Sequence, residues 1–339
     1  MTKKIKLLEK LIKDGSNTTN LYKPSPYWYK KNVQSYEEIK KKGINNFRGS
    51  DNNIGHSFSD NQNLNILNDY YGGLRGFLKL IFENSPFIRS IFYRQITLTS
   101  SFKKLLNLYK SKYLENDSFI NELSEKFILK NTTNFGCEDY IIKKNEKISN
   151  YYLGIADTHQ NFSNKIDFKF AKTFFEIGGG FGANIHFLIE NYKNLRKFIY
   201  LDLPINLYIA TEYLKSIYGK AVKNYVEIEK KEIFFENNEN LEIICIPPWK
   251  IADIKCSFDI FQNSNSFIEM SEEIINNYVF FVKKIMSHNS KILISSYIDL
   301  NNKKIINPEK LINLWGMDFE TFYAKSIIPD RENIYFISK

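Results

Sequence analysis

The spacing of hydrophobic positions changes near residue 165. Before that point, apolar side chains recur every three or four residues, a pattern that predicts helices. These helices are expected over residues 4–13, 35–42, 74–82, 102–113 and 119–129. Residues 45–65 are rich in Asn, Ser, Asp and Gly, which is typical of a loop. The first part of the chain is therefore predicted to be mainly helical.

After residue 165, short apolar runs alternate with helical stretches. The runs predict strands over residues 173–177, 197–201, 241–246, 258–262 and 291–297, with helices over 184–192, 206–218 and 271–286. Strands joined by crossover helices form a parallel sheet that is covered by helices on both faces.

Two further strand-like runs, residues 319–328 and 333–338, follow a predicted helix over 308–315. The link between them is so short that only an antiparallel hairpin can form. We therefore expect an α/β fold: a doubly wound, mostly parallel seven-stranded sheet with an antiparallel terminal hairpin, the strand inventory of class I methyltransferases. Residues 1–145 are expected to form a helical region that serves as a lid, in substrate binding or in oligomerisation, and residues 146–339 the cofactor-binding domain.

The first predicted strand runs into a glycine-rich turn and then a helix, with the sequence Glu176-Ile177-Gly178-Gly179-Gly180-Phe181-Gly182. Glycines let the backbone approach a ligand closely, and a helix N-terminus offers unpaired N–H groups. The letters fit both an S-adenosylmethionine site and the dinucleotide fingerprint. Glu176 favours the former, because it could meet the cationic amino group of S-adenosylmethionine, and so does the terminal hairpin. Asp202 ends the next strand, where either cofactor would offer it ribose hydroxyls.

The chain resembles the sugar O-methyltransferases of bacterial polysaccharide and glycoside pathways over about residues 145 to 300. Besides the glycine turn, the resemblance rests on Tyr200-Leu201-Asp202-Leu203-Pro204, Ile246-Pro247-Pro248-Trp249 and Asn263-Ser264-Asn265-Ser266-Phe267-Ile268-Glu269-Met270. It implies S-adenosylmethionine as methyl donor and a sugar, nucleotide-sugar or glycan hydroxyl as acceptor. The residues expected to hold the cofactor are Glu176, Gly178, Gly179, Gly180, Gly182, Asp202, Leu203, Pro247 and Asn263.

The segment after the fourth parallel strand is expected to face the acceptor, because ligands of open α/β sheets bind beyond the carboxyl ends of the strands. Ser264, Asn265 and Ser266 are the expected contacts, and Glu269 could take the proton of the attacking hydroxyl as a general base. Alternatively, Ser266 and Glu269 have the Ser-x-x-Glu spacing of a capping box. Both interpretations stay open, and Glu269 could serve both.

His159 is the second candidate base, because it lies just before the first strand, in a region that often covers the site in this fold. His186 follows the glycine turn and is interpreted as a packing or surface residue. His288 is expected at the opposite edge of the sheet, and His56 falls in the polar loop.

Positive charge is concentrated near the start of the chain. The formal net charge is +9, and residues 1–115 hold 20 basic against 9 acidic residues. Only six of the 47 basic residues are Arg; four of these, Arg48, Arg75, Arg89 and Arg94, lie in this part. The planar guanidinium suits phosphate, so Arg48 is a candidate for binding a phosphorylated acceptor.

Three alternative functions stay open. One is O-methylation of another small or phosphorylated metabolite. Another is a nucleic-acid-binding methyltransferase attracted by the basic region, although no RNA-binding signature is visible and no nucleic acid is expected. The last is a non-catalytic binding protein, against which the intact glycines and carboxylates argue.

Composition excludes several other classes. The chain is 43% hydrophobic and 25% charged, and its 28 Phe and 22 Tyr exclude a disordered or fibrous protein. No apolar run reaches the length of a membrane span and the charged start lacks a signal region, so a cytoplasmic location is expected. Three cysteines without Cys-x-x-Cys spacing fit neither a disulfide framework nor a zinc site, and no cluster of metal ligands is visible. A homo-oligomer is compatible with the sequence.

Overall fold

The computed structural model describes residues 5–48, 118–137, 140–143, 145–229, 231–299, 308–325 and 331–339. The chain divides into two compact units. The first combines Met1–Lys41, Thr158–Ser326 and Asp330–Lys339, and the second combines Lys42–Asp157 with Ile327–Pro329. The start of the chain therefore belongs with the large sheet, whereas the expected division lay between residues 145 and 146. The helices predicted over 74–82 and 102–113, most of the loop over 45–65, and His56 lie outside the described residues.

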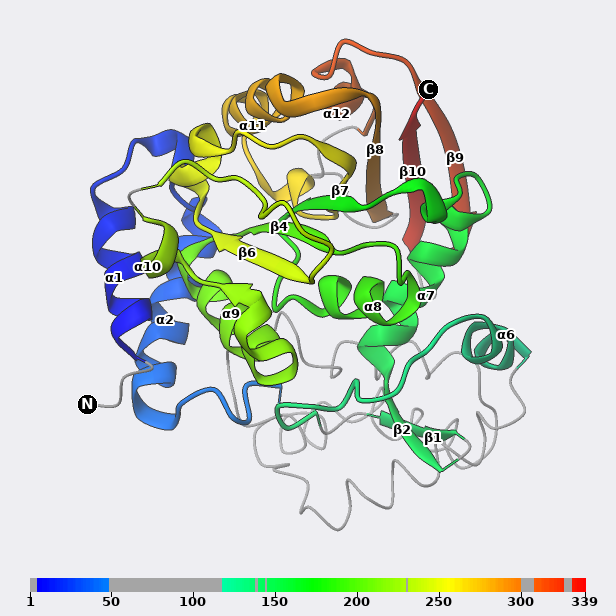
Figure 1. Cartoon of the computed structure of the whole chain (residues 1–339), viewed down its shortest axis with the longest axis horizontal. Helices are drawn as coiled ribbons and strands as arrows, with labels where there is room; N and C mark the ends of the chain where they lie inside the picture. The colour runs from blue at the N-terminus through cyan, green and yellow to red at the C-terminus, as the bar shows by residue number, and fades with distance from the viewer. Residues whose placement is uncertain are drawn as a thin grey trace, which may run out of the picture. The chain divides into compact units, whose positions relative to one another are not determined.

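An eight-stranded sheet forms the centre of the first unit (Figure 1). In spatial order its strands are β5 (Val222–Lys223), β6 (Glu242–Ile246), β4 (Lys197–Leu201), β3 (Thr173–Ile177), β7 (Phe258–Ser264), β8 (Met286–Asp299), β10 (Arg331–Ser338) and β9 (Phe319–Lys325). Neighbouring strands are parallel except for β10, which is antiparallel to both β8 and β9. This arrangement confirms the expected class I methyltransferase fold, with β5 as an additional two-residue edge strand.

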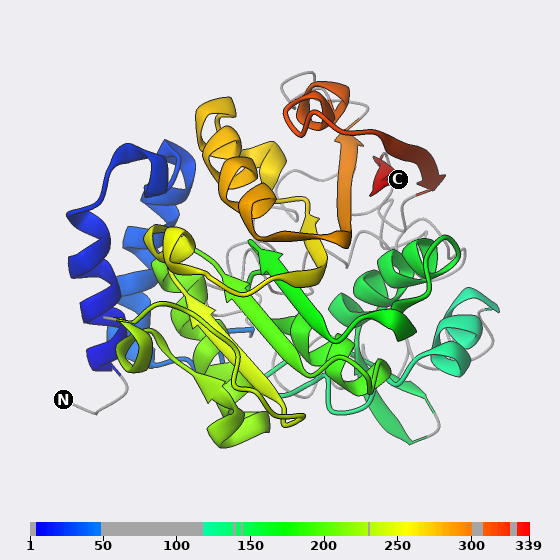
Figure 2. The same ribbon diagram turned by 45° about the horizontal axis from the view of Figure 1, so that its top comes forward.

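Helices cover both faces of this sheet. In Figures 1 and 2, α8 (Ala183–Asn191) and α9 (Pro204–Tyr218) lie on one side, and α11 (Glu272–Ile285) and α12 (Pro308–Asn313) lie on the other. Phe175 and Ile177 of β3 share a buried core with Val279 of α11 and with Trp315. Successive strand residues point to opposite faces, so Glu176 points to the side of α8.

The first helix, α1 (Ile5–Ser16), packs against the sheet unit through a stripe of buried leucines, Leu7, Leu8 and Leu11. Its Gly15 allows close approach, since a Cβ there would lie 3.0 Å from Cζ3 of the Trp249 ring. Tyr225 donates its hydroxyl proton to Asp14 Oδ2 at 2.8 Å. These contacts attach the start of the chain to the loops that follow β5 and β6.

The remaining elements of the first unit are η1 (Asn20–Tyr22), α2 (Pro26–Lys42), η4 (Phe168–Phe170), η5 (Gly219–Ala221), α10 (Tyr225–Ile228), η6 (Pro248–Asp253) and η7 (Phe267–Glu269). The second unit contains α6 (Ser118–Lys126) and a hairpin of β1 (Tyr140–Lys143) and β2 (Glu146–Ser149), and α7 (Asn150–Ser163) begins there and ends in the first unit. No helix among the described residues is long and apolar enough to cross a membrane.

Candidate functional site

The glycine-rich turn joins β3 to α8 at the carboxyl edge of the sheet. Gly178 and Gly180 have φ angles of +76° and +69°, which side chains of L residues rarely adopt. Gly179 is required for a different reason, because a Cβ there would collide with the Glu176 carboxyl group. The turn therefore presents bare backbone with a carboxyl group packed against it.

Glu176 belongs to a buried chain of hydrogen bonds. Asn184 donates from Nδ2 to Glu176 Oε1 at 2.8 Å, and Asn184 Oδ1 lies 2.7 Å from His159 Nε2. Because the amide nitrogen serves Glu176, the amide oxygen accepts the proton of His159 Nε2. His159 thus orients the amide group of Asn184, and Asn184 in turn orients the carboxyl group of Glu176.

The burial of His159 corrects its proposed role as a base. The ring is fully buried and stacks on Phe187 at 4.9 Å between centroids. Burial lowers the pKa of His159 to about 4, so the imidazole is neutral. A ring without solvent access, whose Nε2 is committed to Asn184, orients Asn184 and does not reach an acceptor.

The Glu176 carboxyl group is strongly perturbed. Desolvation raises its pKa from 4.5 to about 8; the hydrogen bond from Asn184 opposes this shift, and the charge of Asp202 adds to it. Its Oε2 is buried and has no hydrogen-bond partner among the described residues. Buried polar atoms are nearly always partnered in folded proteins. An unpartnered carboxyl oxygen beside bare backbone fits a cationic ligand group such as an ammonium.

Asp202 is held by four donors of the protein. Oδ2 accepts from the Gly180 N–H at 2.9 Å and the Tyr200 hydroxyl at 2.8 Å, and Oδ1 accepts from the Leu203 N–H at 2.7 Å and Asn206 Nδ2 at 3.1 Å. Burial raises the pKa of Asp202 to about 6. Because a carboxylate offers about four acceptor positions, contact with ribose hydroxyls requires exchange of at least one of these bonds.

Leu203 and Pro247 lie at neighbouring strand ends. Leu203 precedes α9, and Pro247 is buried at the start of η6. The Asp202 N–H donates to Ile246 O at 3.4 Å, which joins the ends of β4 and β6. Both residues therefore lie at the carboxyl edge of the sheet, as the sequence predicts.

Asn263 ties the end of β7 to the end of β3. Its Nδ2 donates to Ile177 O at 2.9 Å and to Ser266 Oγ at 2.6 Å, and its Oδ1 accepts from the Phe267 N–H at 3.1 Å. Ser266 also packs against Gly178, where a Cβ would collide with it. Asn263 and Ser266 thus support the glycine turn from the side of β7.

The capping-box interpretation of Ser266 and Glu269 is wrong. Ser266 precedes η7 but makes no capping hydrogen bond, because its hydroxyl donates to Ile177 O at 3.2 Å. Ser271 caps the following helix α11 by accepting from the Ile274 N–H at 3.4 Å.

The other acceptor candidates lie closer to solvent. Ser264 Oγ accepts from Gln262 Nε2 at 2.9 Å, and Asn265 is exposed, with a left-handed φ of +64°. Glu269 is exposed as well, and its Oε2 accepts a hydrogen bond from Trp28 Nε1 at 2.7 Å. These side chains line the carboxyl edge beside the glycine turn.

The Arg48 guanidinium is not presented to solvent as a phosphate-binding residue requires, which differs from the expectation. Its guanidinium is buried in the second unit, where Nη1 donates to Thr132 O at 2.7 Å and Nη2 donates to Ser149 Oγ. It therefore serves the internal packing of that unit. Arg75, Arg89 and Arg94 lie outside the described residues.

Sequence reasoning assigned no role to Asn184, Tyr200 or Trp28. The position of Tyr200 could have been used to predict its role. It stands two residues before Asp202, on the same face of the strand. It also pairs in register with Glu176. Its hydroxyl contacts both Gly180 O and Asp202. Asn184 follows the last glycine by two residues, in the first turn of α8. Trp28 offered no signal, because its partner Glu269 is 241 residues away.

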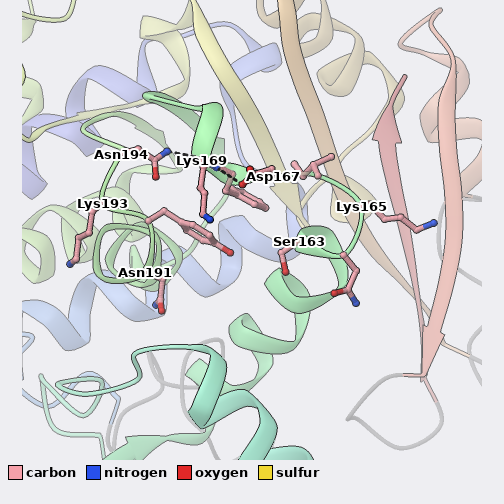
Figure 3. A pocket seen from close by; sticks show the side chains of 11 residues that line it. Ser163, Lys165, Asp167, Lys169, Asn191, Lys193 and Asn194 are labelled. Carbon is pink, nitrogen blue, oxygen red and sulfur yellow. Dashed lines mark hydrogen bonds between the residues drawn. The ribbon is translucent and has the colours of Figure 1, made fainter.

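A separate cavity of about 590 Å³ lies near the amino end of β3, away from the glycine turn (Figure 3). The residues labelled there are Ser163, Lys165, Asp167, Lys169, Asn191, Lys193 and Asn194. Two of its lysines have acidic neighbours, with Lys165 Nζ 2.7 Å from Glu320 and Lys193 Nζ 3.9 Å from Glu190. Within the part of the chain that the structure describes, no group of three His, Cys, Asp or Glu residues could hold a metal ion.

No family model matches the sequence, and no curated protein matches it. Solved structures resemble it weakly. The mitomycin 7-O-methyltransferase MmcR is 15% identical, with 55% of this chain and 54% of that chain covered and a TM-score of 0.38. The N-methyltransferase NodS from Bradyrhizobium japonicum is 12% identical, with 54% and 93% covered and a TM-score of 0.37. The pyocyanin biosynthetic protein PhzM is 13% identical, with 92% and 94% covered and a TM-score of 0.40.

The match spans about half the length of MmcR. These identities and TM-scores are too low for the activity of any neighbour to be transferred to this chain. The assignment of the fold rests on strand order and direction in the sheet itself.

Proposed function

We propose that this chain is an S-adenosylmethionine-dependent O-methyltransferase whose acceptor is a sugar hydroxyl, in polysaccharide or glycoside biosynthesis. The observation that carries the proposal is the buried Glu176 carboxyl group, with its unpartnered Oε2, beside the glycine turn. A dinucleotide places its anionic pyrophosphate at a glycine turn of this kind, where a buried carboxyl group would repel it, whereas the amino-acid part of S-adenosylmethionine carries an ammonium group.

The residues of the chain fit this cofactor on two sides. Glu176 would accept from the ammonium group, and the bare backbone of Gly178 and Gly180 would leave room for the ligand. Asp202, at the end of β4, is the candidate for the ribose hydroxyls once one of its protein donors is exchanged. The cofactor supplies a methyl group on a positively charged sulfur, which is open to attack by an acceptor oxygen.

The protein has two tasks in such a transfer. It must hold the acceptor oxygen in line with the methyl group. Fixing the two reactants in contact in this way supplies most of the rate enhancement. It must also remove the proton of the hydroxyl, because an alcohol is a poor nucleophile while protonated. Glu269 is the candidate base, since it follows β7 at the edge of the sheet where ligands of this fold bind.

The cofactor assignment is tested by calorimetric titration of the full chain with S-adenosylhomocysteine and, separately, with NADH. We expect micromolar binding of the former and none of the latter. Glu176→Gln should weaken binding by about tenfold or more, because it removes the charge that meets the ammonium group. Glu190→Gln, at the other end of α8, is the matched control and should bind as the wild type does. Binding of NADH alone, or of neither ligand, would contradict the proposal.

The acceptor class is tested separately. We expect isotopically labelled methyl groups of S-adenosylmethionine to be transferred to monosaccharides or nucleotide sugars. Transfer to a phenol or a phosphorylated non-sugar metabolite, with none to sugars, would reject the sugar assignment and retain the methyltransferase. Support for a sugar comes from the sequence resemblance and from the polar segment formed by Ser264, Asn265 and Ser266.

A further inference from the structure

We propose that Trp28 is a positioning residue for Glu269, so that helix α2 completes the acceptor side of the site. The inference rests on the proposed function only in taking Glu269 as the general base. Trp28 stands in the first turn of α2, and Glu269 ends η7. The two residues belong to the same compact unit.

The geometry of the contact supports a positioning role. Trp28 Nε1 donates to Glu269 Oε2 at 2.7 Å. An indole N–H is a donor only and is part of a rigid ring, so the bond fixes the direction of one carboxylate oxygen. Among the described residues, no donor bonds the second oxygen, Oε1, which would accept the proton of an acceptor hydroxyl. A carboxylate held in this way is preorganised for proton removal.

The positive charges on α2 also support a role for Glu269 as a base. Desolvation raises the pKa of Glu269 overall, and the hydrogen bond from Trp28 and the charge of Lys31 oppose this shift. Lys31 lies one turn further along α2, with Nζ 5.6 Å from the centroid of the Trp28 ring. The N-terminal turn of a helix also carries positive potential. Helix α2 therefore favours the ionised form of Glu269, which is the form that a base requires.

The contact is a small part of the stability of the chain, because a single hydrogen bond replaces one that both groups make with water in the unfolded chain. Its main effect is therefore on the direction and the ionisation of Glu269. Loss of the indole N–H should change the titration of this carboxyl group while the fold persists.

The first test follows the carboxyl carbon of Glu269 by NMR during a pH titration of the full chain labelled with ¹³C-glutamate, with the signal assigned through Glu269→Gln. Trp28→Phe keeps an aromatic ring and removes the donor. We expect it to raise the pKa of Glu269 by about half a pH unit or more, because the ionised form loses a hydrogen bond. Tyr29→Phe, in the same turn of α2, is the matched control and should leave this pKa unchanged.

The second test uses tryptophan fluorescence and holds even where Trp28→Phe fails to fold. In the wild type, emission should change as Glu269 titrates, and Glu269→Gln should abolish that step. The proposal is overturned if Trp28→Phe leaves the Glu269 titration unchanged, or if the fluorescence step survives in Glu269→Gln.

Titration with S-adenosylhomocysteine separates this proposal from the proposed function. Its affinity should change less than about twofold in Trp28→Phe, because the substitution leaves Glu176 and Asp202 with the hydrogen-bond partners they have in the wild type. A wild-type chain that does not bind this ligand, yet shows the coupled titration, would reject the methyltransferase and keep the Trp28–Glu269 pair. Normal ligand binding with an uncoupled titration would reject the pair alone.

Discussion

At the scale of single residues, Glu176 controls the charge of the proposed cofactor site. In the ligand-free chain its pKa of about 8 means that the carboxyl group holds a proton at neutral pH. A cationic ligand group next to Oε2 favours the ionised form and lowers this pKa. Ligand binding below pH 8 must therefore release a proton.

This release predicts how affinity depends on pH. We expect the affinity for S-adenosylhomocysteine to rise by up to about tenfold per pH unit between pH 6 and 7, and to level off above the pKa of free Glu176. Calorimetry in buffers of different ionisation enthalpy measures both the affinity and the number of protons released. A wild-type affinity that does not change with pH would contradict the prediction, as would the same slope in Glu176→Gln.

At the scale of elements, the starting ends of β4 and β6 are joined by a buried ion pair. Glu242 accepts from Lys197 Nζ at 3.0 Å and from Lys223 Nζ at 2.6 Å, and the side chains of Glu242 and Lys197 are only 4% and 9% exposed. Removing one partner of a buried pair leaves an uncompensated charge in a poorly solvated place.

Glu242→Ala is therefore expected to lower the free energy of unfolding by about 3 kcal/mol. Urea unfolding followed by circular dichroism measures this change. Glu239→Ala is the control, because Glu239 is 86% exposed and lies 3.7 Å from Lys172; a loss of less than about 0.5 kcal/mol is expected there. Equal effects of the two substitutions would show that the buried pair has no special role.

The hydrophobic pattern predicted β3 and β4 to the residue, because each is a short apolar run between turn residues. It placed the start of α2 nine residues too late, at residue 35 instead of Pro26, because the first half of that helix lacks an apolar stripe. It missed β5, whose two residues are strand only through pairing with β6.

The candidate site was likewise predictable only where its residues are neighbours along the chain. Glu176 and the glycines could be placed together because they are neighbours along the chain at the end of β3; their contact with a cofactor stays a prediction. The contacts of Trp28 with Glu269 and of His159 with Asn184 could not be found, because each depends on how separate elements approach in the folded chain.

At the scale of the whole molecule, the first unit is discontinuous along the chain, because α1 belongs with elements that follow residue 158. A chain that begins at residue 146 lacks this helix and uncovers the Trp249 ring and the hydroxyl of Tyr225. Such a chain buries less apolar surface.

We expect the chain over 146–339 to melt at a lower temperature than the full chain and to aggregate. Thermal unfolding and size-exclusion chromatography measure these effects. A peptide over residues 1–45, added in excess, should restore part of the lost stability, because a ligand that binds only the folded state stabilises it. A truncated chain as stable as the full chain would show that α1 and α2 are dispensable for this unit.

The discontinuity also imposes an order on synthesis. The ribosome completes α1 about 200 residues before it reaches Tyr225 and Trp249, which contact Asp14 and Gly15 of that helix. Synthesis proceeds at about 5–20 residues per second. The apolar stripe of Leu7, Leu8 and Leu11 therefore stays without its docking surface for about ten seconds or more. During this interval the exposed apolar stripe of α1 is open to chaperones that bind short apolar segments.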